Sequence, residues 1–482
     1  MEPVLSNTAT GRPERVYASN GRSVRFYCCG PTVYGPAHIG NFRTFLVQDL
    51  FRRVCEAAGL AVTHVRNVTD VDDKTIRESR AAGESLADFA AKWRARFAED
   101  CAALNLLPPH HEPSAVDHVA DQIALIGRLI EGGHAYRADD GSVYFRVSSF
   151  DRYGELARID RSALRRNAEG RQNADDEYSK DDVADFALWK AKKPEDGENH
   201  WESPWGPGRP GWHIECSAMS LAYLGDSIDV HGGGIDLAFP HHENEIAQSE
   251  CATGHRFVRH WFHSAHLMVE GEKMSKSLGN LHVLADLTAE GFHPAEIRWA
   301  LLSGHYRKTL NFTRDAIHAA RRALGRLEAA LASCGAGSAD RPAPSGAGGP
   351  PGELPGEWRL AWAALLDDLN VPKATGHLMK ELARCEKEAA GWDDSERRRW
   401  TAAARFILGV LGIDLSAWAA DRKAAEVDAG PPEEIRRLAE ERWAAKREKD
   451  FATADRLRDE VAAAGWRIKD TPDGYEIEPA SS

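Results

Sequence analysis

The segment from Gly30 to Asn41 combines glycines with a histidine in a way that suits phosphate binding. It reads Gly-Pro-Thr-Val-Tyr-Gly-Pro-Ala-His-Ile-Gly-Asn and lies between a β-prone run and the apolar periodicity of residues 42–58. Glycines let a nucleotide approach the backbone closely, and a helix amino terminus offers positive potential to phosphate. His38 would donate to phosphate oxygens on which charge develops. An ordinary loop with a surface histidine explains this fragment equally well.

A second segment, Lys273 to Ser277, places two lysines and two serines on a loop after a β-prone run at residues 266–269. Lysines reach a polyphosphate as point charges, and serine hydroxyls add hydrogen bonds. The residues that follow, 278–280, read Leu-Gly-Asn. Taken alone, a solvated loop rich in lysine and serine is the better explanation.

Four further residues have the side chains of a metal site. His241 and Glu245 stand four apart on a predicted helix, so they share one face. Cys29 ends the first predicted strand, and Cys216 lies in Gly-Trp-His-Ile-Glu-Cys-Ser at residues 211–217. Two thiols, an imidazole and a carboxylate would form a tetrahedral zinc set. Their dispersed spacing identifies no zinc motif by itself, and buried, inert thiols are the better explanation from the residues alone.

Alternating strand and helix patterns position these residues. A strand at 26–29, a helix at 42–58 and a strand at 61–68 predict a parallel βαβ unit, whose ligands bind at the carboxyl ends of the strands. Further strands are predicted at 227–231 and 266–269, a helix at 241–251, and a hairpin at 136–147. The pattern favours an α/β catalytic half.

The remainder of the chain changes character after about residue 313, where helical spacing of Ala, Arg, Leu and Glu replaces the strand patterns. Residues 335–356 are rich in Gly and Pro and predict a flexible linker. A final unit from 431 to 482 is predicted to contain a helix at 433–464 and a hairpin at 466–477. Residues 162–182 are polar and predict a surface segment.

Composition sets broad limits on the function. The 482 residues are 43% hydrophobic and 28% charged, values that exclude a wholly disordered chain. Eight cysteines are too few for a disulfide scaffold and, with an acidic start that is unlike a signal peptide, indicate a reducing cytoplasm. No apolar run is long enough to span a bilayer, so no membrane association is expected. The net charge of −13 means that any nucleic-acid contact uses local patches.

Together, the two loop segments resemble the paired HIGH and KMSKS signatures of class I aminoacyl-tRNA synthetases, in the expected order. Asn41 stands where the first signature ends in His, and this variant is similar to the cysteinyl-tRNA synthetase branch. The resemblance implies catalytic roles for His38, Asn41, Lys273 and Lys276. It also implies that ATP is bound by Gly30, Pro31, Thr32, His38, Gly40, Asn41, Lys273, Met274, Ser275, Lys276 and Ser277.

The same resemblance assigns the metal and the amino-acid pocket. Cys29, Cys216, His241 and Glu245 match the zinc ligands of that branch, in which the metal also accepts the substrate thiolate. Zinc favours a soft sulfur over a serine hydroxyl, so discrimination needs no editing domain, and no candidate for one is seen. The implied cysteine-binding residues are Cys29, Thr69, Trp212 and Asp236.

The resemblance covers most of the chain and implies an α/β, Rossmann-type catalytic domain at 1–312, with an insertion at about 110–215. A helical bundle for the tRNA stem and anticodon follows at 313–426, and a small α+β anticodon module at 431–482. The implied function is activation of L-cysteine with ATP and Mg²⁺, followed by transfer to the 3′-terminal adenosine of tRNA(Cys), by a cytoplasmic monomer.

Two alternatives remain open. The first is a ligase that passes activated cysteine to glucosaminyl-inositol in mycothiol synthesis, which shares the adenylate step and the zinc set but lacks the carboxyl-terminal region. The second is a catalytically silent, synthetase-like binding protein. The unit from residue 431 onward has a net charge of about −3 and therefore lacks the basic footprint of an RNA-binding domain. Base reading by stacking and hydrogen bonding needs no such footprint.

Overall fold

The structure is a computed structural model that describes residues 2–159, 172–173, 176, 184–274, 279–335, 349–428, 431–471 and 474–479. The described residues do not include most of the polar segment 162–182 or much of the Gly/Pro-rich segment 335–356. They also do not include Ser275, Lys276 and Ser277. The chain forms two compact units, Met1–Asp414 and Leu415–Ser482. Each is described by itself.

A four-stranded parallel sheet forms the centre of the first unit. Its strands are β3 (Val24–Cys28), β4 (Val62–Arg66), β10 (Ile228–Gly234) and β11 (Val258–Ser264), in the order β11-β10-β3-β4. The predicted parallel-sheet α/β class is confirmed. Strand β11 was not predicted: five of its seven residues are His, Arg, Trp or Ser, and they alternate poorly, although six of the seven are buried.

The order of the strands creates a crevice where the chain changes direction. From β3 the chain passes through helix α1 (Ile39–Ala57) to β4 on one side, whereas β10 pairs with the other side of β3. In open α/β sheets such a switch point leaves a cleft beyond the carboxyl ends of the strands. The residues after β3 and β10 therefore face a common site.

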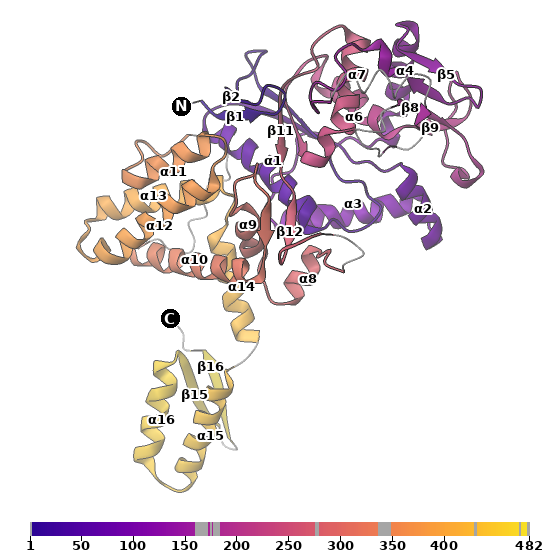
Figure 1. Ribbon diagram of the computed structural model, residues 1–482. Coiled ribbons are helices and arrows are strands. Elements are labelled where there is room, and N and C mark those ends of the chain that lie inside the picture. Colours follow the sequence, from indigo (N-terminus) through magenta and orange to yellow (C-terminus); the bar gives the residue numbers. More distant parts are fainter. Residues whose placement is uncertain are drawn as a thin grey trace. The chain divides into compact units, whose positions relative to one another are not determined.

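Helix α1 begins where the sequence supplies a cap. The His38 side chain accepts from the Asn41 N–H, and the Asn41 side chain accepts from the His38 N–H, which together form a capping box. The helix is buried on nearly all sides, because it packs on the sheet and also contacts helices α9 (Pro294–Leu302) and α13 (Asp394–Val410) (Figure 1).

A second, mixed sheet is inserted between β4 and β10. Its strands β5 (Ala135–Arg137) and β6 (Val143–Phe145) form the predicted hairpin, and β8 (Asp185–Ala191) joins them, with β7 (Gln172–Asn173) and β9 (Gly208–Pro210) beside it. Its core is continuous with nearby helices. These and the preceding helices are α2 (Asp73–Ala82), α3 (Leu86–Ala103), α4 (Val119–Glu131), α6 (Trp212–Leu224) and α7 (His241–Thr253).

The rest of the first unit surrounds the sheet. Strands β1 (Val4–Asn7) and β2 (Arg12–Arg15) form a hairpin that contacts β11, while β12 (Leu267–Val269), β13 (Glu272–Lys273) and β14 (Leu310–Phe312) form a small sheet. The remaining helices are α8 (Leu284–Ala289), α10 (Arg314–Ser333), α11 (Gly356–Leu366) and α12 (Val371–Glu388). Short 3₁₀ turns are η1 (Val116–His118), η2 (Val147–Ser149), η3 (Pro194–Asp196), η4 (Ile235–Ala238) and η6 (Ala389–Gly391).

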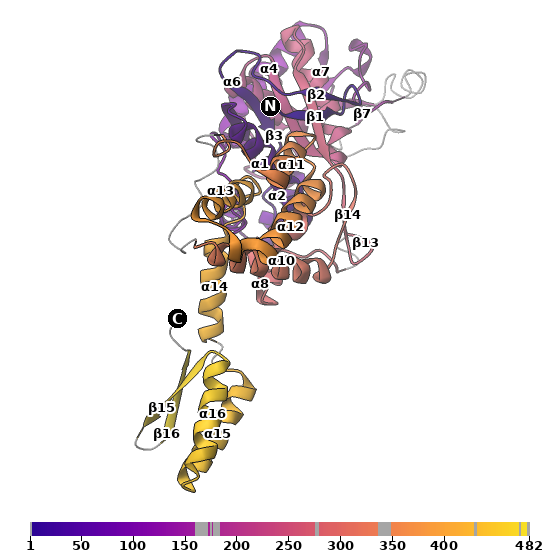
Figure 2. The ribbon, with the colours of Figure 1, turned by 90° about the vertical axis from the view of Figure 1, so that its left-hand side faces the viewer.

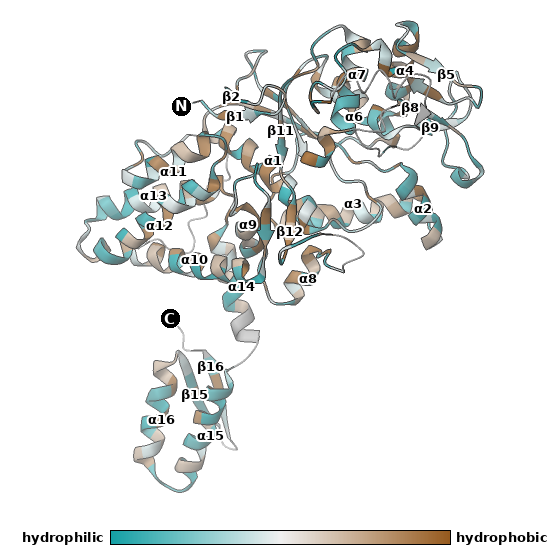
Figure 3. Ribbon diagram, viewed as in Figure 1, coloured by the Kyte–Doolittle hydropathy of each residue, from teal (hydrophilic) through white to brown (hydrophobic). Residues whose placement is uncertain are grey.

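The second unit contains helix α14 (Leu415–Asp428) and the yellow elements of Figure 2: helices α15 (Glu433–Arg447) and α16 (Phe451–Ala463) and strands β15 (Trp466–Thr471) and β16 (Gly474–Pro479). The predicted hairpin is confirmed, with Ile468 opposite Ile477. The single helix predicted at 433–464 is wrong, because Lys449 has a φ of +64° and Asp450 caps a new helix. Both helices carry hydrophobic and hydrophilic residues (Figure 3), and their apolar faces meet the hairpin.

Among the described residues no single helix is long and apolar enough to cross a membrane. Two consecutive helical stretches, Asp394–Val410 and Leu415–Ala424, meet the length and composition criteria only when taken together.

Candidate functional site

Four side chains that lie far apart in the sequence meet at the crevice. The Cys29 and Cys216 sulfurs are 3.9 Å apart, and Nε2 of His241 lies 3.1 Å from Oε1 of Glu245. The ligand atoms of all four residues lie within 4.8 Å of one another. All four side chains are buried. The structure therefore brings together the complete predicted set.

Regular elements hold each of these residues. Cys29 follows the last residue of β3, Cys216 lies in the second turn of α6, and His241 and Glu245 share one face of α7. Gly211 permits the start of α6 to approach β8, since a Cβ there would lie 2.2 Å from the Ala187 carbonyl oxygen. The positions of the four side chains thus follow from the packing of a strand and two helices.

The charges within this cluster are strongly coupled. Burial acts to raise the pKa of Cys216, but a hydrogen bond with Cys29 and the charge of His241 outweigh it and lower that pKa to about 6. Burial acts to lower the pKa of His241, but Cys216 and Glu245 raise it to about 10. The pKa of Cys29 is raised by burial and by Cys216. Without a metal, the cluster thus tends toward a thiolate and imidazolium pair.

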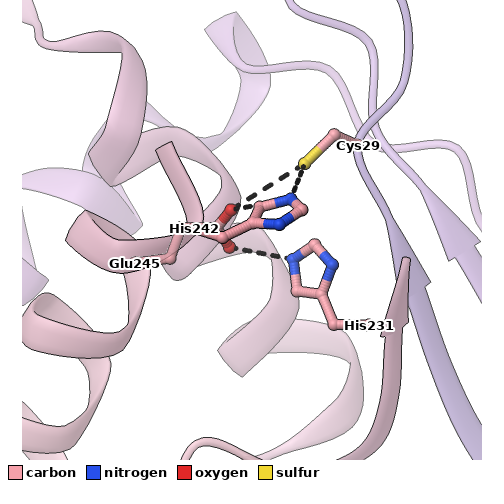
Figure 4. Close-up of side chains that lie close together, drawn as sticks. All are labelled: Cys29, His231, His242 and Glu245. Atoms are coloured by element: carbon pink, nitrogen blue, oxygen red, sulfur yellow. Dashed lines mark hydrogen bonds and ion pairs between the residues drawn. The ribbon is translucent and has the colours of Figure 1, made fainter. Parts of the chain in front are cut away.

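A second histidine pair shares two members of the cluster, as Figure 4 shows. His231 Nε2 lies 3.0 Å from Glu245 Oε2, and His242 Nε2 lies 3.4 Å from the Cys29 sulfur. Burial acts to raise the pKa of Glu245, but His231 and His241 lower it to about 2. Cys29, His231, His242 and Glu245 would form an alternative ligand set, with one sulfur instead of two.

The donor set fits zinc. Two sulfurs, one imidazole nitrogen and one carboxylate oxygen are common zinc ligands, and their complete burial would favour a cation that neutralises them. His241 is also oriented from outside: its Nδ1 is 3.0 Å from His213 Nδ1, and its ring packs on Trp212 at a centroid distance of 4.3 Å. Partners of this kind fix the ring of a metal-binding histidine.

Thr69 lies three residues beyond the end of β4 and is linked to Cys216 of the cluster through Asn67. Its hydroxyl donates to Glu215 Oε2 at 3.0 Å and accepts from the side chain of Asn67 at 3.3 Å. Asn67 Oδ1 also accepts from the Gly30 N–H at 2.9 Å. A Cβ on Gly30 would lie 1.6 Å from the Asn67 carbonyl oxygen, so this position requires glycine. The loops after β3 and β4 are thereby joined.

The predicted phosphate-binding loop, residues 30–41, is also held by contacts with the loop after β4. Thr32 pairs with Thr69 in an isolated parallel bridge, and the Thr69 N–H donates to the Pro31 carbonyl oxygen at 3.0 Å. At the start of α1, His38 Nδ1 accepts the Asn41 N–H at 3.2 Å. An accepting Nδ1 carries no proton, so in the neutral ring the proton is on Nε2. His38 can therefore donate from Nε2 to an anion.

The described residues on either side of the predicted lysine and serine loop lie close to the start of α1. Lys273 is exposed in β13, and a Cβ on Gly40 would lie 2.4 Å from the end of the Met274 side chain. The Ile39 N–H donates to the His282 carbonyl oxygen at 2.9 Å. Segments on both sides of residues 275–278 therefore contact the start of α1. The predicted sites Ser275, Lys276 and Ser277 lie outside the described residues.

Asp236, a predicted cysteine-binding residue, differs from the four buried cluster residues in its exposure. It lies in η4, two residues beyond β10, and is exposed. The sequence analysis missed His231, His242 and His263, which extend the cluster: His242 Nδ1 lies 2.8 Å from His263 Nε2. Two of them had a signal in the sequence, since His231 ends a predicted strand and His242 stands beside His241, whereas His263 lies on the unpredicted strand β11 and only the fold shows that these rings meet.

The amino-acid sequence of this chain is similar to those of known proteins. A family model described as the catalytic domain of class I (C) tRNA synthetases matches residues 15–322. A protein named cysteine–tRNA ligase from Opitutus terrae is 54% identical over 460 residues, which are 95% of this chain and 94% of that protein. Another of the same name from Alkalilimnicola ehrlichii is 45% identical over 474 residues, 98% of each chain.

Solved structures share the fold at low identity. A methionyl-tRNA synthetase from Mycobacterium tuberculosis, in complex with methionyl-adenylate, has a TM-score of 0.55 at 17% identity and covers 83% of this chain and 90% of its own. The LeuRS of Agrobacterium radiobacter, in ternary complex with tRNA and LeuAMS, has a TM-score of 0.57 at 14% identity, with coverages of 84% and 86%. The likeness to these structures concerns the fold.

Proposed function

Because the chain belongs to the cysteine–tRNA ligase family of class I aminoacyl-tRNA synthetases, we propose that it activates L-cysteine with ATP and transfers the cysteinyl group to tRNA(Cys). The observation that carries this proposal is the meeting of Cys29, Cys216, His241 and Glu245 beside the loop that begins α1. A sulfur-rich cation site and a phosphate-binding loop at one crevice suit a substrate with a thiol at one end and a reacting carboxylate at the other.

In the first step, the cysteine carboxylate attacks the α-phosphate of ATP, and the bond from that phosphorus to pyrophosphate breaks. The products are cysteinyl-adenylate and pyrophosphate, so no side-chain nucleophile is needed. His38 donates from Nε2 to phosphate oxygens, and Lys273 and Lys276 add positive charge. Asn41 keeps the His38 ring in place through the capping box. Mg²⁺ accompanies ATP and neutralises part of its charge.

The backbone around His38 and the lysine loop completes the ATP site. Gly30, Pro31 and Thr32 line the loop after β3, and Gly40 leaves room for Met274 above the first turn of α1. Ser275 and Ser277 would add hydroxyl donors to the phosphates. A nucleotide held there has its α-phosphate within reach of the amino-acid pocket at the same strand ends.

The selection of cysteine rests on the buried cluster. Zinc bound by Cys29, Cys216, His241 and Glu245 would accept the substrate sulfur as a thiolate, a ligand that a serine hydroxyl does not replace. Trp212 covers His241 and forms an apolar wall. Thr69 offers its hydroxyl to the polar end of the substrate, and Asp236 offers a carboxylate to the ammonium group.

In the second step, a hydroxyl of the 3′-terminal ribose attacks the activated carbonyl and AMP leaves. The predicted division assigns the catalytic domain to residues 1–312, with its insertion at about 110–215. Residues 313–426 and 431–482 are assigned to the stem and anticodon of the tRNA. In the last unit, Arg442 and Lys446 are both paired with Asp470, which makes these two cations less available to RNA phosphates.

A direct test offers labelled cysteine, ATP and Mg²⁺ to the purified protein, with tRNA in one tube and glucosaminyl-inositol in another. Label on tRNA alone is expected. Label on the sugar would refute the tRNA role while leaving the adenylate step in place. Absence of cysteine-dependent exchange between ATP and pyrophosphate would refute an enzymatic function. It would favour the alternative of a catalytically silent, synthetase-like binding protein.

A further inference from the structure

Two cysteines outside the crevice have their sulfurs in contact. The Cys334 and Cys385 sulfurs are 3.7 Å apart. Cys334 caps the end of α10 and Cys385 lies in α12, and these two helices lie side by side (Figures 1 and 2). The other close pair of sulfurs in the described chain, Cys29 and Cys216, belongs to the proposed zinc site. The pair between α10 and α12 therefore has no part in the function proposed above.

In the described part of the chain, no candidate metal site includes this pair. The groups of three or more side chains that are placed to hold a cation contain neither Cys334 nor Cys385. Both residues are buried, with exposures of 8% and 1%. Two thiols in contact and without further ligands are suited to forming a bond with each other.

Two arginines align the helices on both sides of the sulfur pair. Arg326 on α10 donates two hydrogen bonds, at 2.9 and 2.8 Å, to the carboxylate of Glu386, which follows Cys385. Arg397 on α13 donates to the carbonyl oxygens of Ser333 and Ala389, both at 2.8 Å. These carbonyls belong to the end of α10 and to the turn after α12. The two helix ends are therefore fixed relative to each other.

The remaining distance between the sulfurs is short. A disulfide bond is about 2.05 Å long, so the sulfurs must approach by about 1.7 Å. Cys334 is the C-cap of α10, and the next residue, Gly335, has a φ of +76°. Because Cys334 stands at the end of its helix, closure of the bond moves a terminal residue and requires no shift of either helix axis.

The two thiols differ in reactivity. Cys334 is the more exposed of the two, and it is the one that an external reagent reaches. Burial and the neighbouring Cys334 raise the pKa of Cys385 to about 12, against the lowering effect of Ser333 and Arg384. The thiolate is the attacking form, so Cys385 reacts second. Modification of Cys334 removes its contribution to the raised pKa, and Cys385 then attacks the adjoining sulfur.

We infer that Cys334 and Cys385 form a reversible oxidation site, at which a low-molecular-weight disulfide converts the two thiols into a disulfide between α10 and α12. The Cys334 sulfur attacks one sulfur of the external disulfide, whose S–S bond breaks and releases one thiol. The Cys385 sulfur then attacks the Cys334 sulfur and releases the second thiol. The two protons of the protein thiols pass to the two released sulfurs. The protein is thus oxidised by two electrons, and the external disulfide is reduced by two.

The bond would close a loop between positions that stand 51 apart in the sequence and that enclose the Gly/Pro-rich segment 335–356. A cross-link over such a length restricts the unfolded chain and thereby stabilises the folded one. An excess of a reducing thiol opens the bond again, so this stabilisation is present only under oxidising conditions. The inference is independent of the proposed function, because it involves neither the cluster nor the nucleotide end.

The test incubates the full-length, zinc-loaded protein with oxidised glutathione, unfolds it, blocks the remaining thiols and maps its peptides by mass spectrometry without reduction. A peptide that carries Cys334 should be joined to one that carries Cys385, with the loss of two hydrogen atoms. Free thiols should fall from eight to six, and an excess of reduced glutathione should restore all eight. Because the readout is mass, failure of the proposed function does not affect this test.

Three variants test the order of the two steps. Cys385→Ser should retain one glutathione on Cys334, because no second thiol displaces it. Cys334→Ser should carry no glutathione on Cys385, because that residue is only 1% exposed. Cys251→Ser is the matched control: Cys251 is partly exposed on α7 and lies outside the pair, so its loss should leave the linked peptides unchanged.

Three outcomes would overturn the inference. The first is that Cys334 and Cys385 remain unmodified in the wild type or carry separate glutathiones. The second is a link between Cys29 and Cys216 in place of the expected one, which would show that the oxidant acts at the proposed zinc site. The third is a link that an excess of reduced glutathione does not open.

Discussion

The amino-acid end and the nucleotide end of the crevice are built differently. At the amino-acid end, Cys29, Cys216, His241 and Glu245 come from the ends of packed elements and are buried. At the nucleotide end, His38 is partly exposed and Lys273 is exposed on a short strand. A site that excludes water strengthens interactions with one sulfur, whereas a site that ATP enters and pyrophosphate leaves needs solvent access. Selection and reaction therefore depend on different kinds of structure.

This contrast predicts different consequences of mutation. A substitution in the cluster changes the cation, and through it the substrate, because the four ligands are buried together and His213 and His231 further orient His241 and Glu245. A substitution at the nucleotide end changes the rate of the chemical step and leaves the packing intact. The two classes are separable by measuring zinc content, melting temperature and pyrophosphate exchange on the same variants.

The largest effect is expected for Cys216→Ser. Loss of a sulfur ligand should reduce both zinc content and cysteine-dependent exchange by more than about 100-fold, the upper end for removing a partner outside the ligand set. Elemental analysis and exchange kinetics measure the two quantities. Cys251→Ser, on the outer part of α7 and not in the cluster, is the matched control and should change neither.

The same variant distinguishes the two ligand sets. If zinc stays bound at full occupancy in Cys216→Ser while exchange is lost, the metal is held by Cys29, His231, His242 and Glu245 instead. That outcome would contradict the ligand set proposed above. It would also mean that Cys216 and His241 lie beside the metal without binding it.

The second effect concerns His38→Asn. Asparagine is a good helix cap, so α1 and the melting temperature should be preserved, while the Nε2 donor is lost. Removal of one donor to a developing negative charge typically costs about 10²- to 10³-fold in rate. Exchange should therefore slow by this amount with zinc content unchanged. A parallel loss of zinc would show that the two ends are not independent.

The third effect is expected for His231→Gln. His231 contacts Glu245 and not the proposed metal directly, and loss of such a partner costs about 10- to 100-fold in metal affinity. Competition with a chelator measures this affinity, and the KM for cysteine should rise with it. Unchanged zinc affinity would show that the orientation of Glu245 does not depend on its contact with His231. His318→Gln, on α10, is the control far from the cluster.

The strand and helix patterns of the sequence predicted the parallel sheet, whereas the four cluster residues came from the resemblance to the family, since α6 and α7 are buried on both faces and their spacing identifies no metal motif. The sequence could not predict that His231, His242 and His263 surround these residues, since those contacts join β10, α7 and β11 through tertiary packing. It also merged α15 and α16, because the break at Lys449 depends on one left-handed residue in a continuous helical pattern. Asp236 follows β10 as expected, but its exposure depends on how η4 turns.

The smallest effect is expected at Gly40, which we compare with Gly30, the residue that follows the cluster ligand Cys29. At Gly30 an added Cβ would meet the Asn67 carbonyl oxygen at 1.6 Å, and this backbone atom cannot move without separating β3 from β4. At Gly40 the added Cβ would meet the end of the flexible Met274 side chain, which can move aside. Gly30→Ala should therefore destabilise the fold by about 3 kcal/mol, and Gly40→Ala by less than about 1 kcal/mol. Thermal unfolding measures both; equal losses would show that the nucleotide end is packed as rigidly as the cluster.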